Sequence, residues 1–311
     1  MKGYWIISLA VLSTILFGCG YDDQTPMPVT VVHVPDTGQT QSYTSSFGQD
    51  SDYLLHPPSY SDNGNGTIID NVTGLTWQKE YNGSAQLFYE TDDYCAGLTL
   101  AAFSDWRPPS DFELMTIVDY GTSAPAINGT YFPNTRSDFR WWTLTGEKSS
   151  SFFTTRWAVD FGTGNLETPH FSSSGYTRCV RGGQNQPRVF EDNRNGTITD
   201  RITQLVWQKQ DEGTTAVWED AITVCEKLSL GRYSDWRLPN VKELRSIVDS
   251  GTYAPAIYAG YFPNTQSNSY WSSTTYGASP DAAWHVNFWH GEVAGSLKGN
   301  ALFVRCVRGG E

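Results

Sequence analysis

Apolar residues recur at helical spacing in two stretches of the second half of the chain, and both stretches have counterparts in the first half. The earlier stretch predicts a helix with a cysteine on its buried face, its apolar positions being Trp218, Ala221, Ile222, Cys225 and Leu228. The later stretch predicts a helix capped at Asn240 and ending near Gly251, with a buried stripe of Val241, Leu244, Ile247 and Val248. Its counterpart starts at a Ser110–Glu113 capping box, ends near Gly121 and buries Leu114, Ile117 and Val118.

Strand patterns lie on either side of these helices. Asparagine–glycine turns within 62–66 and 192–196, each followed by a short apolar run, predict a β-hairpin before the first helix. Alternation over 283–288 and an apolar run over 301–307 predict two strands after the second helix. The pattern predicts an α+β fold for each copy: an N-terminal hairpin, two helices, short antiparallel strands and long loops.

The two asparagine–glycine turns also resemble calcium loops, because each combines Asp and Asn. Both lack the alternating acids and the distal Glu of an EF-hand. A structural turn is therefore the favoured interpretation and bound calcium the alternative; no other metal or cofactor is predicted.

One motif sets the register of the two copies. It reads SDWRPP at 104–109 and SDWRLP at 234–239, a shift of 130 that also relates Trp77 to Trp207. Near the end the shift falls to 127, which relates RCVRGG at 178–183 to the same letters at 305–310. Three residues are therefore missing between Trp271 and His285, and we expect this change in a surface loop. The period predicts two tandem domains, 58–184 and 185–311.

The N-terminal segment has the pattern of an export signal. Residues 1–18 combine Lys2 with an apolar run too short to span a membrane comfortably. The following residues, Leu16 to Cys19, resemble a bacterial lipobox, which would make Cys19 the acylated mature N-terminus in the outer membrane or on the cell surface. The alternative is an ordinary secretory signal. Residues 19–57 are rich in Pro, Thr, Ser and Gln, and this composition predicts a flexible tether.

Four further cysteines occupy matching positions in the two copies. The repeat symmetry selects the disulfides Cys95–Cys179 and Cys225–Cys306 from three possible connectivities. Each would close a loop that contributes about 4 kcal/mol in the chain-entropy model. Metal ligation is the alternative, but these cysteines lack the close Cys or His pairs that zinc sites show.

In combination, the motifs NGTIxD, LxWQK, SDWRxP and RCVRG resemble the C-terminal domain of the legionella collagen-like adhesin. The resemblance covers residues 60–183 and 190–310. It implies a C-type lectin-like fold. The expected disulfide between the first helix and the last strand of each copy agrees with that fold. The adhesin itself binds sulfated glycosaminoglycans. That ligand is not carried over, because the formal net charge of −12 repels polyanions, nucleic acids included. The short motifs of calcium-dependent sugar-binding lectins are absent.

The recurring SDWR motif has two interpretations. As a ligand clamp it would offer its Asp, Trp and Arg to a partner. As a structural element its Trp would be buried and an Asp–Arg pair would brace the turn into the capped helix, which is the interpretation we favour. The residues are Asp105, Trp106, Arg107, Asp235, Trp236 and Arg237.

Residues that differ between the copies are the candidate ligand-binding residues. Exposed tryptophan faces stack well on sugar rings, so tryptophans and the polar residues beside them are considered. The candidates are Trp142, Trp284, His285, Trp289 and His290. The alternative is ordinary strand packing. A metal held by the two histidines is disfavoured, because their spacing points to opposite faces of a strand.

Known catalytic signatures are absent: the sequence has no phosphate-binding glycine loop, nucleophile elbow or HExxH. We therefore predict a non-catalytic surface lipoprotein that binds a carbohydrate or cell-surface protein, for adhesion or recognition. The alternative is a structural or protein-partner accessory lipoprotein of the cell envelope, and a hydrolase is the third and weakest hypothesis.

Overall fold

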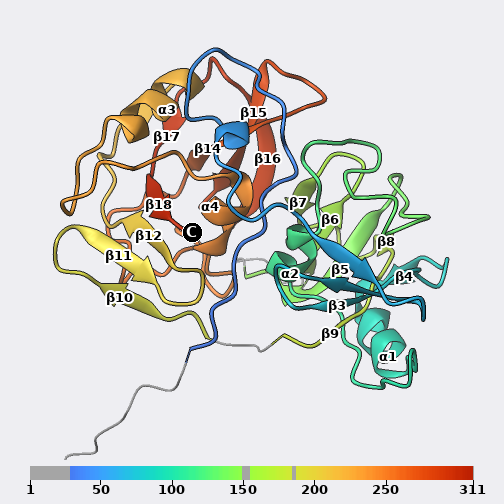
Figure 1. The fold of residues 1–311 in the computed structure, drawn as a ribbon. Helices are drawn as coiled ribbons and strands as arrows, with labels where there is room; N and C mark the ends of the chain where they lie inside the picture. Colours follow the sequence, from blue (N-terminus) through green and yellow to red (C-terminus); the bar gives the residue numbers. More distant parts are fainter. Residues whose placement is uncertain (1–28, 149–154, 184–186, 311) are drawn as a thin grey trace, which may run out of the picture.

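The computed structural model describes residues 29–148, 155–183 and 187–310. Repeat 1 (residues 58–184) and repeat 2 (residues 185–311) have the same order of elements and lie side by side (Figure 1). Each repeat begins with a four-stranded antiparallel sheet whose fourth strand comes from its C-terminal end. The strands are β1 (Tyr60–Asp62), β2 (Thr67–Asp70), β3 (Thr76–Gln78) and β9 (Val180–Arg181) in repeat 1, and β10 (Phe190–Asp192), β11 (Thr197–Asp200), β12 (Leu205–Gln208) and β18 (Val307–Gly309) in repeat 2.

The predicted hairpin is confirmed in both repeats, and its turn requires glycine. Gly66 and Gly196 have φ values of +87° and +89°, which only glycine adopts without strain. The last strand, predicted over 301–307, is divided in two. Leu302–Phe303 (β17) and β18 belong to different sheets, because the intervening Arg305 turns inward to the carbonyls of Gln208 and Lys209.

The helices are short. They are α1 (Thr91–Ala96) and α2 (Asp111–Thr116) in repeat 1, and α3 (Trp218–Glu226) and α4 (Val241–Ser246) in repeat 2, with a 3-10 turn η2 (Phe88–Glu90) before α1. Both predicted capping boxes are present, at Ser110 and at Asn240. The predicted ends near Gly121 and Gly251 are wrong, because the chain leaves the helix after one and a half turns. In repeat 2, Val248 then pairs with Ile257.

One eight-stranded sheet runs through both repeats (Figure 1). Its order is β13 (Thr215–Ala216), β17, β14 (Ser269–Thr275), β15 (Ala282–Asn287), β16 (Glu292–Leu297), β7 (Asn165–Glu167), β6 (Arg156–Asp160) and β5 (Arg140–Gly146). A separate pair joins β4 (Gln86–Leu87) to β8 (Ser174–Gly175). The missing residues of repeat 2 fall in the loop between β14 and β15, in the predicted interval.

The repeats meet at equivalent strands. β16 pairs with β7 in antiparallel direction, and Val293 lies opposite Leu166, its own counterpart at the shift of 127. Equivalent residues that pair with one another mark an approximate two-fold axis, as in an isologous dimer interface. A single cluster of buried apolar residues includes members of both repeats, so the two domains share a core.

Residues 30–57, which we call the N-terminal strap, are not a flexible tether as predicted. They run along both repeats and include the 3-10 turn η1 (Asp50–Asp52) (Figure 1). The strap is held mainly by polar contacts, which apolar periodicity does not reveal. Gln39 exchanges two hydrogen bonds with the backbone of Thr275, and Thr37 accepts one from the Tyr120 amide. Cys19 and the export signal lie outside the described residues, among which no helix is long and apolar enough to span a membrane.

Candidate functional site

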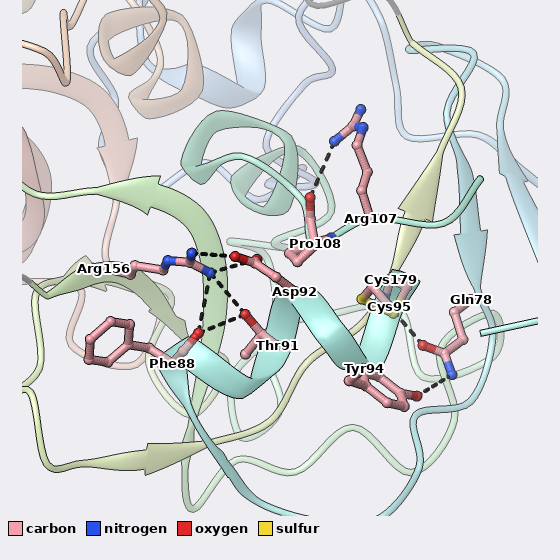
Figure 2. The surroundings of a disulfide bond; sticks show 10 residues. All are labelled: Gln78, Phe88, Thr91, Asp92, Tyr94, Cys95, Arg107, Pro108, Arg156 and Cys179. Carbon is pink, nitrogen blue, oxygen red and sulfur yellow. Dashed lines mark hydrogen bonds and ion pairs between the residues drawn. A yellow bond between two sulfur atoms is a disulfide. The ribbon is translucent and has the colours of Figure 1, made fainter. Parts of the chain in front are cut away.

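The predicted disulfides are confirmed. Cys95–Cys179 joins α1 to the segment before β9, and Cys225–Cys306 joins α3 to the segment before β18. Figure 2 shows the surroundings of the first bond, where Arg156 holds the start of α1 through Asp92 at 2.7 Å. This arrangement fixes the helix to the sheet.

The residues of the SDWR motif make structural contacts within each repeat. The ion-pair partners of its Asp and Arg differ from the predicted ones. Trp106 and Trp236 are buried. Asp105 pairs at 2.7 Å with Arg181 of the last strand, not with the Arg of its own motif. Arg107 instead pairs with both carboxylate oxygens of Glu113, the capping-box residue of α2, at 2.7 Å. Repeat 2 has the same contacts, Asp235–Arg308 at 2.8 Å and Arg237–Glu243 at 2.6 Å. The motif therefore connects the last strand, the turn and the helix cap.

The candidate aromatic residues are not brought together. Trp142 is fully buried in repeat 1, where its indole N–H donates to the Gln86 carbonyl at 3.0 Å. Trp284 is 1% exposed and packs between Tyr120 of the other repeat and Tyr276. Neither tryptophan offers a face to a ligand, so strand packing is the correct interpretation for both.

The remaining three candidates, His285, Trp289 and His290, differ in burial and in their contacts. Burial lowers the pKa of His285 to about 4, so this side chain is neutral at physiological pH. His290 stacks on Trp157 of repeat 1, with ring centroids 5.8 Å apart. Only Trp289 is well exposed, at 55%, and its carbonyl accepts a hydrogen bond from the Ala254 amide.

The asparagine–glycine turns use their polar atoms internally. Asp62 accepts from the Gly64 amide and pairs with Lys79 at 2.6 Å, and Asp192 pairs with Lys209 at 2.7 Å. Within the described ranges, no group of three or more His, Cys, Asp or Glu side chains is placed to hold a metal ion.

A pocket between the repeats is the feature that the sequence did not indicate. This inter-repeat pocket has a volume of about 390 Å³. The strap, the α2 and α4 segments and the start of repeat 2 surround it. Its polar and aromatic lining includes His33, Asp111, Phe112, Glu113, Arg188, Arg245, Ser246, Asp249, Ser250 and Tyr258.

A buried ion pair joins the repeats at this pocket. Arg245 of α4 bonds to the Asp111 carboxylate of α2, which also accepts from Ser250 at 2.7 Å and Thr145 at 2.8 Å. Burial acts to raise the pKa of Asp111, but the Arg245 charge and these hydrogen bonds outweigh it, and the net shift is downward. Asp111 is therefore ionised. The guanidinium of Arg245 also lies 5.5 Å from the Trp157 ring centroid.

Several polar atoms around the pocket are uncommitted. Ser246 Oγ, Arg245 Nε and His33 Nδ1 are buried and have no hydrogen-bond partner among the described residues. Among the described residues, Arg188 contacts the Asp200 carboxylate at 3.3 Å, and its guanidinium lies 5.1 Å from the Phe112 ring centroid. A ligand that carries both donors and acceptors can therefore bond Arg188 directly, and it can reach the three buried atoms once their side chains turn toward the pocket.

Differences between the copies were the signal that could have found this pocket. Asp111 corresponds to Val241, Arg245 to Met115 and Ser250 to Tyr120, so apolar and polar residues exchange at three positions in or near the capped helices. Each polar member lines the pocket.

Comparison with protein families gives two matches in tandem. The model described as the Lcl C-terminal domain matches residues 66–181 and 196–308, which is most of the described chain. Comparison with curated proteins finds no significant match. The two matched ranges coincide with the two repeats, and each contains one disulfide, one SDWR motif and one capped helix. The chain belongs to the Lcl C-terminal domain family.

Proposed function

We propose that this protein is a lipid-anchored surface protein that recognises a carbohydrate or another cell-surface ligand and carries out no catalysis. The observation that carries the proposal is the tandem family match, since this adhesin-type family implies a surface location and a binding function. Cys19 would provide the lipid anchor in the outer membrane, and the strap would hold the repeats close to it. A C-type lectin-like fold is part of the proposal, supported by the disulfide from helix to last strand in each repeat.

The chemistry of the inter-repeat pocket supports binding over catalysis. Asp111 is ionised and bonded to Arg245, Ser250 and Thr145, so it has little capacity left to accept a substrate proton. Glu113 is bonded by Arg107 through both oxygens. Two of the three acids that line the pocket are thus committed to structural contacts, and Asp249 alone lacks the second acid that a glycoside hydrolase would use.

A glycan array with soluble residues 20–311 tests the proposal, because this chain retains every described residue. We expect saturable binding to a defined set of glycans, unchanged by a chelator since no metal is proposed. Absence of binding to every glycan, together with a stable co-purifying envelope protein, would contradict carbohydrate recognition and support the accessory role. Release of products from polysaccharides would contradict the absence of catalysis.

A further inference from the structure

We infer that the inter-repeat pocket binds the uncharged terminal sugar of a glycan chain. The inference rests on the proposed function and specifies both the site and the ligand class. It depends on the size of the pocket, its charge balance and its uncommitted polar atoms.

The volume of the pocket suits one end of a glycan. Sites for small molecules have volumes of roughly 300–1,000 Å³, and about 390 Å³ lies near the lower limit. A terminal sugar fits such a space, whereas a long stretch of chain needs an extended groove. Phe112 and Tyr258 supply aromatic lining for the apolar face of a sugar ring.

The charges of the lining favour a neutral ligand. Asp111, Glu113 and Asp249 bring three negative charges, and Arg188 and Arg245 bring two positive ones. Glu113 is neutralised by Arg107 at the edge, and Arg188 also faces the buried Asp200. No excess positive charge remains for a carboxylate or sulfate, and the net charge of −12 repels anions at longer range.

The uncommitted atoms match sugar hydroxyls, which both donate and accept hydrogen bonds. Ser246 Oγ and His33 Nδ1 belong to lining residues and have no partner among the described residues, so each can bond a sugar hydroxyl once its side chain turns toward the pocket. Arg188 offers further donors. Asp249 supplies an acceptor, because only one of its carboxylate oxygens has a described contact, with the Gly251 amide at 2.9 Å.

Two matched substitutions test the site on a glycan array. Asp249 and its counterpart Asp119 make the same contact with a following glycine, at 2.9 Å in both repeats, but only Asp249 lines the pocket. Asn preserves this contact. We expect Asp249→Asn to weaken binding to neutral-ended glycans about tenfold, the loss of roughly one hydrogen bond, and Asp119→Asn to leave it unchanged.

Two further variants keep the inference testable. Ser246→Ala removes a hydroxyl that has no described partner, so we expect an unchanged melting temperature and weaker binding. Trp289→Ala removes the exposed aromatic side chain outside the pocket, and we expect unchanged binding.

The possible results separate this inference from the proposed function. Glycan binding that is lost in Trp289→Ala but kept in Asp249→Asn and Ser246→Ala overturns the pocket and leaves the proposed function standing. Preference for sialylated, uronic or sulfated ends overturns the ligand class. Absence of binding to all glycans overturns the inference and the carbohydrate part of the proposed function.

Discussion

The two repeats have a buried arginine at equivalent positions, but its positive charge has different partners in each. Arg178 and Arg305 both donate to two consecutive carbonyls and to a threonine hydroxyl. Arg305 also pairs at 2.7 Å with Asp211, whereas repeat 1 has Tyr81 at that position. Burial lowers the pKa of Arg178 to about 9, so it stays charged at neutral pH without a carboxylate. Backbone carbonyls are therefore sufficient for the fold, and the carboxylate is an addition of repeat 2.

The strap accounts for a second difference between the repeats. Tyr53 lies over Arg237, with the guanidinium 5.3 Å from the ring centroid, and Lys242 donates to the Asp36 carbonyl at 2.9 Å. The Arg237–Glu243 side chains are 5% exposed, whereas Arg107 and Glu113 are 27% and 17% exposed. The equivalent Arg–Glu pairs thus differ in solvent exposure, because the strap covers the pair of repeat 2.

Removal of a disulfide should affect both repeats strongly and to a similar extent. The bonds close sequence separations of 84 and 81 residues, and loss of either should cost about 4 kcal/mol in the chain-entropy model. Denaturant unfolding of the double variants Cys95→Ala/Cys179→Ala and Cys225→Ala/Cys306→Ala measures this cost. A large asymmetry would show that strap contacts compensate for the lost bond in repeat 2.

The buried arginines should respond unequally to loss of their neighbours. Asp211→Asn leaves the Arg305 charge buried without a carboxylate and should cost about 3 kcal/mol, as expected for breaking a buried ion pair. Tyr81→Phe removes no charge and should cost less than about 1 kcal/mol. Equal unfolding free energies for the two variants would refute the view that the Asp211 carboxylate stabilises repeat 2.

Local sequence signals predicted the parts of each repeat that local chemistry determines. The capping boxes, the glycine turns and the disulfides follow from residues a few positions apart or from the repeat symmetry, and all are present. The strap and the inter-repeat pocket depend on contacts between distant segments, such as Gln39 with Thr275. Composition could not reveal these contacts, because the same polar residues suit a solvated tether equally well.

Two of the aromatic candidates were wrong for different reasons. Trp142 differs between the copies, and sequence does not distinguish a tryptophan exposed for binding from one buried against a new neighbour; the structure packs it near Phe88. Trp284 has Trp157 as its counterpart at the shift of 127, so it recurs as the other core tryptophans do. It packs against Tyr120 across the repeat boundary.

The contact of the strap with repeat 2 should weaken as pH rises. Asp50 is buried and accepts hydrogen bonds from Thr37 at 2.7 Å and Thr274 at 2.6 Å. Burial, together with the nearby Glu243 and Asp36 charges, raises the pKa of Asp50 to about 7. The folded protein therefore holds a proton that the unfolded chain has released above about pH 4, and roughly 2 kcal/mol of stability should be lost between pH 5 and pH 7.

Asp50→Asn provides the control for this pH dependence. The amide cannot ionise, so stability measured by denaturant titration should vary less between pH 5 and pH 7 than in the unchanged chain. Hydrogen exchange should show faster opening of the strap at pH 7 in the unchanged chain, after correction for the intrinsic exchange rate. An equal pH dependence in the two proteins would assign the effect to another group.

The smallest expected difference concerns the helix caps. Ser110 and Asn240 each accept a hydrogen bond from the Glu amide three positions on, at 3.1 Å and 2.9 Å. Ser110→Ala should cost about 1 kcal/mol, because water can reach the freed amide of a half-buried cap. Asn240 is 5% exposed, so Asn240→Ala should cost about 2 kcal/mol, as expected for a buried amide left unpaired. If strap coverage causes this difference, combining each substitution with Asp50→Lys, which detaches the strap, should bring the two costs together; a persistent gap would place the cause within the helices.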